Sequence, residues 1–216
     1  MSTTNDLGHL RKSYEKGTLT DALKDESPIT IFEQWFAAAE AHPAIEEANA
    51  MSIVTLGKDK FPKARVVLLK QFSTEGFVFY TNYNSEKGQA ILAYPQVGIS
   101  FFWPALERQV IVKGTAEKVA PAVSDVYFSS RPLGSQLGAM ASMQSAVIAS
   151  REVLETQLAN LEAQYKEHPP KRPDHWGGFL VRPQEIEFWQ GRPNRLHDRL
   201  HFTLDQGNWT AQRLSP

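Results

Sequence analysis

The chain has no cysteine among its 216 residues. Disulfide scaffolds, cysteine-ligated zinc, iron–sulfur clusters and thiol nucleophiles are therefore excluded, and the composition fits a reducing compartment. An excess of either charge is also missing, since 23 basic residues stand against 24 acidic ones and the net charge is -1. No global field attracts nucleic acid or an anionic membrane, so any anion must be bound by a local cluster of side chains.

Long apolar runs are missing as well. No stretch approaches the roughly 20 apolar residues of a membrane helix, and the opening MSTTNDLGHLRKSY has no apolar core of the kind found in a signal peptide. We therefore expect a cytoplasmic protein. The sequence contains no GxGxxG, GxxxxGK[ST] or GxSxG motif, so a bound phosphate would have to be held by side chains.

Apolar patterning predicts strands through most of the chain. Strand-type segments bounded by turn residues cover 50–56, 64–70, 76–82, 96–103 and 108–119, and they return at 176–183, 184–191, 195–204 and 207–214. Helical spacing predicts helices from Pro28 to about His42 and over 85–94, 121–131 and 147–165. This pattern indicates a mainly β (α+β) fold, an antiparallel barrel or strongly curled sheet with peripheral helices.

The pattern also predicts the domain organisation. Residues 1–27 are polar with few large apolar groups, so we expect a flexible N-terminal arm. Residues 28–216 are expected to form a single domain. The proline-rich segment 166–174 is a connector within it, because only about 40 residues follow, too few for a domain of their own.

Two segments carry candidate anion-binding side chains. In ARVVLLK, Arg65 and Lys70 lie an odd number of residues apart, so a regular strand points them to opposite faces. Either the strand bends, or the two cations serve different groups, or both simply end a strand with their charges in water. In FYTNYNSEK, Thr81 ends a strand, while Ser85 and Lys87 open a helix whose amides favour anions. This loop is a candidate phosphate site, although ordinary turns have the same composition.

The C-terminal run FWQGRPNRLHDR holds a dense group of cations. Strand alternation predicts Arg195, His197 and Arg199 on one face, an arrangement that is costly unless an anion meets them. His197 and His201 have a spacing that would suit a metal on a helix, but the segment has a strand pattern and no third ligand. We therefore expect an anion site here and no metal.

Several separated motifs, taken in order, resemble one known family. They are HLRKSY, RVVLLK, FVFYTNYNSEK, FFWPALERQV, YFSSRPLGSQLGAMASMQS, HWGGF, IEFWQGRPNRLHDR and the terminal RLSP. Over nearly its whole length the chain is similar to the pyridoxine (pyridoxamine) 5′-phosphate oxidases. The resemblance implies an FMN-binding split β-barrel that dimerises through its C-terminal strands and holds FMN at the subunit interface. It also implies oxidation of pyridoxine or pyridoxamine 5′-phosphate to pyridoxal 5′-phosphate by hydride transfer to FMN, with O2 as acceptor and H2O2 as product.

The same resemblance implies roles for particular side chains. The catalytic pair would be Arg195 and His197. The FMN contacts would be Arg65, Val66, Val67, Leu68, Leu69, Lys70, Tyr80, Thr81, Lys87, Gln109, Gln144, Ser145, Trp189 and Arg199. The substrate contacts would be Lys70, Tyr127, Arg131, Ser135, Arg195 and His197, with Arg11 and Tyr14 on an arm that can cover the site.

One position departs from the family pattern. Some members have arginine where this chain has Glu86, which gives them a second cation at the FMN phosphate. Here Arg65 and Lys87 are left to neutralise that phosphate, and the role of Glu86 stays open. Two rival functions also stay open: a split-barrel flavin reductase acting on another acceptor, and a module that binds pyridoxal phosphate without turnover.

Overall fold

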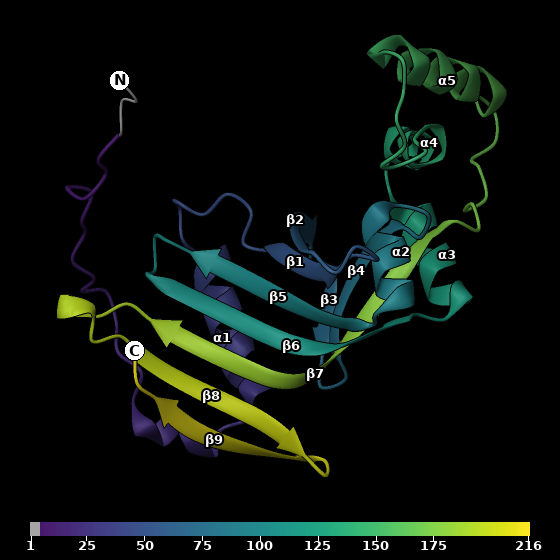
Figure 1. The fold of residues 1–216 in the computed structure, drawn as a ribbon. Coiled ribbons are helices and arrows are strands. Elements are labelled where there is room, and N and C mark those ends of the chain that lie inside the picture. Colours follow the sequence, from purple (N-terminus) through teal and green to yellow (C-terminus); the bar gives the residue numbers. More distant parts are fainter. Residues whose placement is uncertain (1–4) are drawn as a thin grey trace. The chain divides into compact units, whose positions relative to one another are not determined.

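The computed structural model describes residues 5–216 (Figure 1). The chain divides into two compact units. Unit 1 consists of Met1–Ala48, Phe101–Ile111 and Glu185–Pro216, and unit 2 of Asn49–Ser100 and Val112–Gln184. Hydrogen bonds join the strands in the order β2-β1-β5-β6-β7-β4-β3, with β8 and β9 following from β7. This curled antiparallel sheet with flanking helices confirms the predicted mainly β fold.

Unit 2 holds most of the strands. They are β1 (Ala50–Leu56), β2 (Pro62–Leu68), β3 (Gln71–Ser73), β4 (Gly76–Asn82) and the larger parts of β5 (Gln96–Trp103), β6 (Arg108–Lys118) and β7 (Trp176–Gln190). In antiparallel register, Ile53 lies opposite Arg65, and Thr81 lies opposite Gly177. The strands predicted between residues 50 and 119 are confirmed. The pattern missed β3, which is too short to show an alternation.

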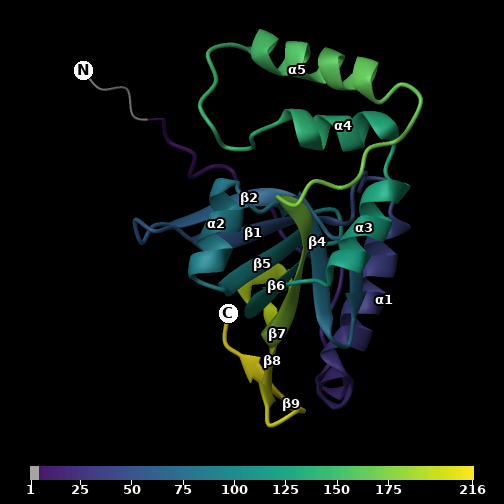
Figure 2. The ribbon, with the colours of Figure 1, turned by 90° about the vertical axis from the view of Figure 1, so that its right-hand side faces the viewer.

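The helices of unit 2 include one that the sequence pattern missed. They are α2 (Glu86–Ala93), α3 (Pro121–Ser130), α4 (Leu133–Ala141) and α5 (Arg151–Gln164). Ser85 caps α2 as predicted, because its Oγ accepts a hydrogen bond from Gly88 N at 3.2 Å. α5 begins at Arg151, later than predicted, and Val147 before it is 99% exposed. The missed helix, α4, lies beside α5 (Figure 2).

Unit 1 combines α1 with the C-terminal hairpin. Its elements are η1 (Asp21–Asp25), α1 (Pro28–Glu40), η2 (Pro193–Arg195), β8 (Asp198–Asp205) and β9 (Asn208–Leu214). The Ser27 Oγ accepts a hydrogen bond from Ile29 N at 3.3 Å, so α1 begins where the sequence predicts. The ring of Trp35 lies 5.2 Å from Phe188, which lies 5.8 Å from Phe202. These edge-to-face contacts join the helix to the strands in one core.

The N-terminal segment has defined contacts within unit 1. The Glu107 carboxylate is 2% exposed and accepts backbone N–H groups from Glu15 at 2.7 Å and from Lys16 at 3.0 Å. Residues 1–4 of the predicted arm lie outside the described residues. The flexibility expected for residues 1–27 stays a prediction.

The structure corrects the prediction for the C-terminal cations. β8 begins after His197, so Arg195, His197 and Arg199 do not share a strand face. Pro193 cannot donate to a strand ladder, and Arg195 has a left-handed φ of 61°. The Arg199 guanidinium donates to both oxygens of Glu187, at 2.7 and 3.0 Å, so a carboxylate of the protein meets its charge. Residue alternation within one strand reveals neither the turn before β8 nor the partner strand that supplies Glu187.

The segments predicted as two strands at 176–183 and 184–191 form one continuous strand, β7. It pairs with β4 through residues 176–181 and with β8 through residues 185–190. Pro183 falls between these two registers, where neither partner needs its missing N–H. Within residues 5–216, the structure contains no helix with the length and apolarity that a membrane span requires.

Candidate active site

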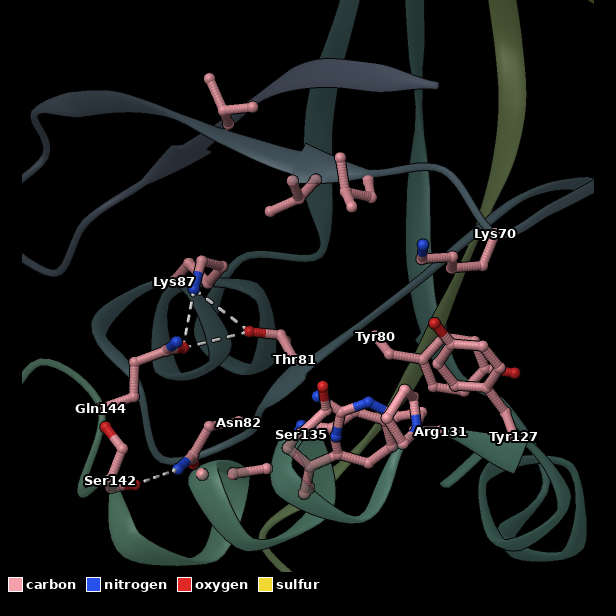
Figure 3. A pocket seen from close by; sticks show the side chains of 17 residues that line it. Lys70, Tyr80, Thr81, Asn82, Lys87, Tyr127, Arg131, Ser135, Ser142 and Gln144 are labelled. Carbon is pink, nitrogen blue, oxygen red and sulfur yellow. Dashed lines mark hydrogen bonds between the residues drawn. The ribbon is translucent and has the colours of Figure 1, made fainter. Parts of the chain in front are cut away.

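Unit 2 contains a cavity of about 550 Å³ (Figure 3). Its lining residues are Val66, Val67, Leu68, Lys70, Tyr80, Thr81, Asn82, Lys87, Tyr127, Arg131, Pro132, Ser135, Gly138, Ala139, Ser142, Gln144 and Trp176. Strand β2 supplies the aliphatic part of the lining, and β4, α2, α3 and α4 contribute aromatic, hydroxyl and cationic groups. Many of the side chains that the sequence predicts for a site are thus brought together.

Stacked aromatic rings form part of the cavity wall. The Tyr80 and Tyr127 rings lie 3.9 Å apart at 23°, and the Trp176 ring lies 5.5 Å from Tyr80 at 13°. Gly178 makes room for the stack, because a Cβ there would lie 2.9 Å from Tyr80 Cε1. The Tyr80 hydroxyl is buried and has no hydrogen-bond partner in the described chain; burial, and then Tyr127, raise its pKa. A flat wall with an unpaired hydroxyl suits a planar ligand with polar substituents.

Arg131 is a cation held against this aromatic wall. Its guanidinium carbon lies 4.7 Å from the centroid of Trp176. Gln136 Nε2 donates to the Arg131 carbonyl at 2.8 Å and thereby holds the turn between α3 and α4. Burial lowers the pKa of Arg131, but a guanidinium stays protonated at neutral pH. Its Nη1 is buried with no hydrogen-bond partner among residues 5–216. A bound anion would replace the hydrogen bonds to water that this nitrogen loses on burial.

Lys87 forms a second cationic position, apart from Arg131 in the cavity (Figure 3). Its Nζ donates to Gln144 Oε1 at 2.9 Å and to Thr81 Oγ1 at 3.1 Å. Burial, and then the charge of Arg65, lower the pKa of Lys87 to about 8. An ammonium that is desolvated beside another cation favours a bound anion, because the anion stabilises the charged form.

Three further predicted residues of unit 2 do not line the cavity. Arg65 Nη1 donates to Thr55 Oγ1 at 2.6 Å, which fixes its guanidinium against β1. Ser145 Oγ accepts a hydrogen bond from Glu86 N at 3.2 Å, at the start of α2. Arg65 and Ser145 therefore both lie beside the first turn of α2, whereas Leu69 is buried at 3% exposure.

The other predicted site residues belong to unit 1. They are Arg11, Tyr14, Gln109, Trp189, Arg195, His197 and Arg199. Three of them form a ring cluster: Trp189 lies 4.7 Å from His197, and Tyr14 lies 5.7 Å from each of these two rings. Gly191 is required here, because a Cβ would lie 2.7 Å from Tyr14 Cγ.

The hydrogen bonding of His197 fixes its tautomer. Its Nδ1 accepts a hydrogen bond from Arg192 N at 3.1 Å, so a neutral ring carries its proton on Nε2. Burial, and then the charge of Arg195, lower the pKa of His197 and favour the neutral ring. His197 therefore presents a hydrogen-bond donor at Nε2.

Two of the predicted cations of unit 1, Arg199 and Arg11, bond to the protein itself. Glu187 raises the pKa of Arg199 through their paired hydrogen bonds. Arg11 Nε donates to Gly8 O at 3.1 Å on the exposed arm. Over the described part of the chain, no group of three or more His, Asp or Glu side chains could hold a metal ion.

Comparison with known protein families decides the classification. Residues 37–165 match the family model described as pyridoxamine 5′-phosphate oxidase. Residues 176–216 match the model described as the pyridoxine 5′-phosphate oxidase C-terminal dimerisation region. The chain belongs to the pyridoxamine 5′-phosphate oxidase family. Its cavity residues and its aromatic wall lie mainly within the first match, and β8 and β9 lie within the second.

Full-length relatives support membership of this oxidase family. A pyridoxine/pyridoxamine 5′-phosphate oxidase of Flavobacterium johnsoniae is 56% identical over 212 residues, which cover 98% of this chain and 99% of the relative. A protein of the same name from Synechocystis is 52% identical and covers 97% of this chain and 98% of its own length. The predicted family is therefore confirmed.

Solved structures support the split-barrel fold of the oxidase family. PhzG from Burkholderia lata, crystallised in complex with tetrahydrophenazine-1-carboxylic acid, has a TM-score of 0.86 and 26% identity, covering 95% of this chain and all of its own. An FMN-binding protein from Nostoc punctiforme related to pyridoxamine 5′-phosphate oxidase has a TM-score of 0.70 at 14% identity over 89% of this chain, a likeness of fold alone. Family membership supports flavin binding.

Sequence reasoning missed several cavity residues of this oxidase. They are Asn82, Pro132, Gly138, Ala139, Ser142 and Trp176. Most of them lie in or beside α4, a helix that the sequence pattern did not predict. The small residues Ser135, Ala139 and Ser142 recur at spacings of a helix face, a signal that could have revealed this wall.

Proposed function

We propose that this protein is an FMN-dependent oxidase that converts pyridoxine or pyridoxamine 5′-phosphate to pyridoxal 5′-phosphate, with O2 as acceptor and H2O2 as product. One observation carries the proposal: a single cavity holds two separate cationic positions, at Lys87 and at Arg131, beside a flat aromatic wall. Cofactor and substrate each bring a planar ring and a phosphate. The names of the curated relatives agree with this reading.

The residues around Lys87 fit the phosphate of FMN. Lys87 and Arg65 supply charge, and Thr81, Gln144 and Ser145 supply hydrogen-bonding groups. The aliphatic residues of β2 that line the cavity, from Val66 to Leu68, suit the edge of a flavin ring, and Lys70 and Tyr80 are further contacts. When bound, FMN supplies the two-electron acceptor that no amino-acid side chain provides.

The residues around Arg131 fit the phosphorylated pyridine. Arg131 offers a planar fork for phosphate, with an Nη1 that needs a partner. Lys70, Tyr127 and Ser135 line the same cavity and add an ammonium and two hydroxyls. Binding energy from the phosphate, a group remote from the reacting carbon, orients the ring for oxidation.

The residues of unit 1 are proposed to act at the reacting end. His197 would orient the substrate as a donor from Nε2, and Arg195 would stabilise charge that develops there. Tyr14 and Arg11 would cover the substrate, while Gln109, Trp189 and Arg199 would contact FMN. The dimerisation region at residues 176–216 supports assembly as a homodimer.

An anaerobic spectral titration tests the proposed function. The purified protein should be yellow, and addition of pyridoxine 5′-phosphate without oxygen should bleach its visible flavin band. Admission of air should restore the colour and release one H2O2 per pyridoxal phosphate formed. A colourless protein that still binds pyridoxal phosphate supports the binding module. A yellow protein that does not bleach supports the reductase.

A double variant separates chemistry from cofactor binding. Arg195→Met with His197→Ala should keep the flavin and its colour, because neither side chain is among the proposed FMN contacts. Its rate of anaerobic bleaching should fall by roughly 100-fold or more, since orientation and charge stabilisation each contribute a large factor. Unchanged bleaching would show that the catalytic assignment is wrong.

The lowered pKa of Lys87 predicts how FMN affinity depends on pH. Without an anion the pKa is about 8, so above that pH Lys87 loses its charge and FMN binding must take up a proton. The dissociation constant for FMN should therefore rise above pH 8, approaching roughly tenfold per pH unit. Fluorescence titration of the flavin-free protein measures it. Riboflavin, which lacks the phosphate, and Lys87→Met with FMN should both give flatter profiles.

A further inference from the structure

The first turn of α2 places a carboxylate among three cations. Glu86 Oε2 lies 2.6 Å from Lys63 Nζ and 3.8 Å from Arg65 Nη2. Lys63 and Arg65 are two residues apart on β2, so both side chains project from the same face of the strand. The next residue of the helix is Lys87, whose pKa is lowered by burial and then by the charge of Arg65, and is raised by the charge of Glu86.

The backbone of Lys63 also helps to fix Arg65. Arg65 Nη1 donates to the Lys63 carbonyl at 3.0 Å and to Thr55 Oγ1 at 2.6 Å. The Arg65 side chain is only 17% exposed, whereas those of Lys63 and Glu86 are 59% and 51% exposed. The arginine is therefore the fixed member of the group, and the glutamate and lysine are the members that can rearrange.

The charges of the group decide what a phosphate would meet. A carboxylate this close to Arg65 competes with any other anion for the guanidinium. Lys63 neutralises that carboxylate, and the net charge of Lys63, Arg65, Glu86 and Lys87 together is +2, which matches a phosphate dianion. Without Lys63, Glu86 would be free to pair with Arg65, and the net charge would fall to +1.

We propose that Lys63 is a positioning residue for cofactor binding: by pairing with Glu86, it leaves Arg65 available to the phosphate of FMN. The inference rests on the proposed function only in taking FMN as the ligand at this position. It gives Glu86 a role, as a resident anion that lowers cofactor affinity when Lys63 does not neutralise it.

A double-mutant cycle tests the proposal. The probes are FMN and riboflavin, titrated by fluorescence into the full-length protein from which flavin has been removed. Lys63→Met should weaken FMN binding by roughly tenfold at low salt and by less at 0.15 M, because the pair is partly exposed and screened. The same substitution in a Glu86→Gln background should weaken it by less than about twofold, since no carboxylate remains to be neutralised. Riboflavin binding should not change in either case.

A matched control removes the effect of net charge. Lys58→Met deletes the same charge from the exposed turn that precedes β2, and it should leave FMN affinity unchanged. The proposal is overturned if Lys63→Met behaves like this control, or if its effect is equally large with Glu86→Gln. If the unsubstituted protein binds FMN and riboflavin equally, or binds neither, then the proposed phosphate site of the cofactor is wrong. That result is distinct from a failure of the role proposed for Lys63, which shows only in the substituted proteins.

Discussion

Arg131→Met is expected to raise the KM for pyridoxine 5′-phosphate by roughly 100-fold to 1000-fold, with a much smaller effect on kcat. Losing charge-assisted hydrogen bonds from a planar fork costs about 3 to 4 kcal/mol, which is this range of affinity. Methionine keeps the apolar stem against Trp176, whose centroid lies 4.7 Å from the guanidinium carbon. Steady-state kinetics with the phosphorylated and the unphosphorylated substrate measure the effect, and the unphosphorylated substrate should be insensitive.

The stability of the same variant gives an independent check. Arg131 Nη1 is buried and unpaired in the described chain, so the free protein bears a desolvation cost that methionine removes. The melting temperature should therefore stay the same or rise while the KM increases. Arg131→Lys keeps the charge but loses the fork and should be intermediate. If the variant loses its flavin and keeps its KM, Arg131 belongs to the cofactor and the substrate assignment is wrong.

Local chemistry made part of the site predictable from sequence. Ser85 has the residue type and position of a helix cap, and the cap places Lys87 in the first turn of α2 as expected. The spacing of Arg65 and Lys70 predicts that the strand bends, that the two cations serve different groups, or that both end the strand with their charges in water. Lys70 lines the cavity, whereas Arg65 lies beside Glu86, which agrees with separate roles.

Partners from other strands made the rest unpredictable. Alternation within one strand suggested that Arg199 needs an external anion, but Glu187 on β7 already pairs with it. Likewise His201, considered for a metal, has its Nε2 at 3.1 Å from Glu185 Oε2 on the same neighbouring strand. Cross-strand pairing depends on register, and the register of β7 and β8 follows from a turn whose left-handed Arg195 no hydrophobic pattern reveals.

The contacts of Glu107 are also made to a distant segment that no sequence pattern reveals. They predict a large effect of Glu107 on amide exchange in the N-terminal segment. Its carboxylate accepts the N–H groups of Glu15 and Lys16 and lies 3.2 Å from Lys12 Nζ. Glu107→Leu leaves two backbone donors and an ammonium without their acceptor, which costs about 2 to 4 kcal/mol. Amide hydrogen exchange in residues 12–17 should accelerate roughly 30-fold to 1000-fold. The flavin content of the protein should not change.

The pH dependence shows whether residues 12–17 are held by the charge of Glu107 or by packing alone. Burial alone would raise the pKa of Glu107, but the N–H groups of Lys16 and Glu15 and the ammonium of Lys12 outweigh it, and the pKa lies below the usual 4.5. The docked state therefore gains stability that is complete above that pH and is lost as the pH falls through the lower, docked value. Exchange in residues 12–17, corrected for its intrinsic pH dependence, should rise on acidification in the unsubstituted protein. In Glu107→Gln it should be faster at neutral pH and independent of pH in this range.

Two further variants test whether the Glu107 carboxylate holds residues 12–17. Glu117→Gln removes a similar charge from an exposed pair with Arg182 and should leave exchange in residues 12–17 unchanged. Gly191→Ala should release the same segment while keeping the Glu107 carboxylate, because its Cβ would lie 2.7 Å from Tyr14 Cγ and 3.1 Å from Glu107 Cβ. In both Glu107→Leu and Gly191→Ala the Tyr14 ring would leave His197, so each should raise the KM more than it lowers kcat if Tyr14 covers the substrate. If exchange in residues 12–17 accelerates but the kinetics do not change, Glu107 holds this segment and Tyr14 does not cover the substrate.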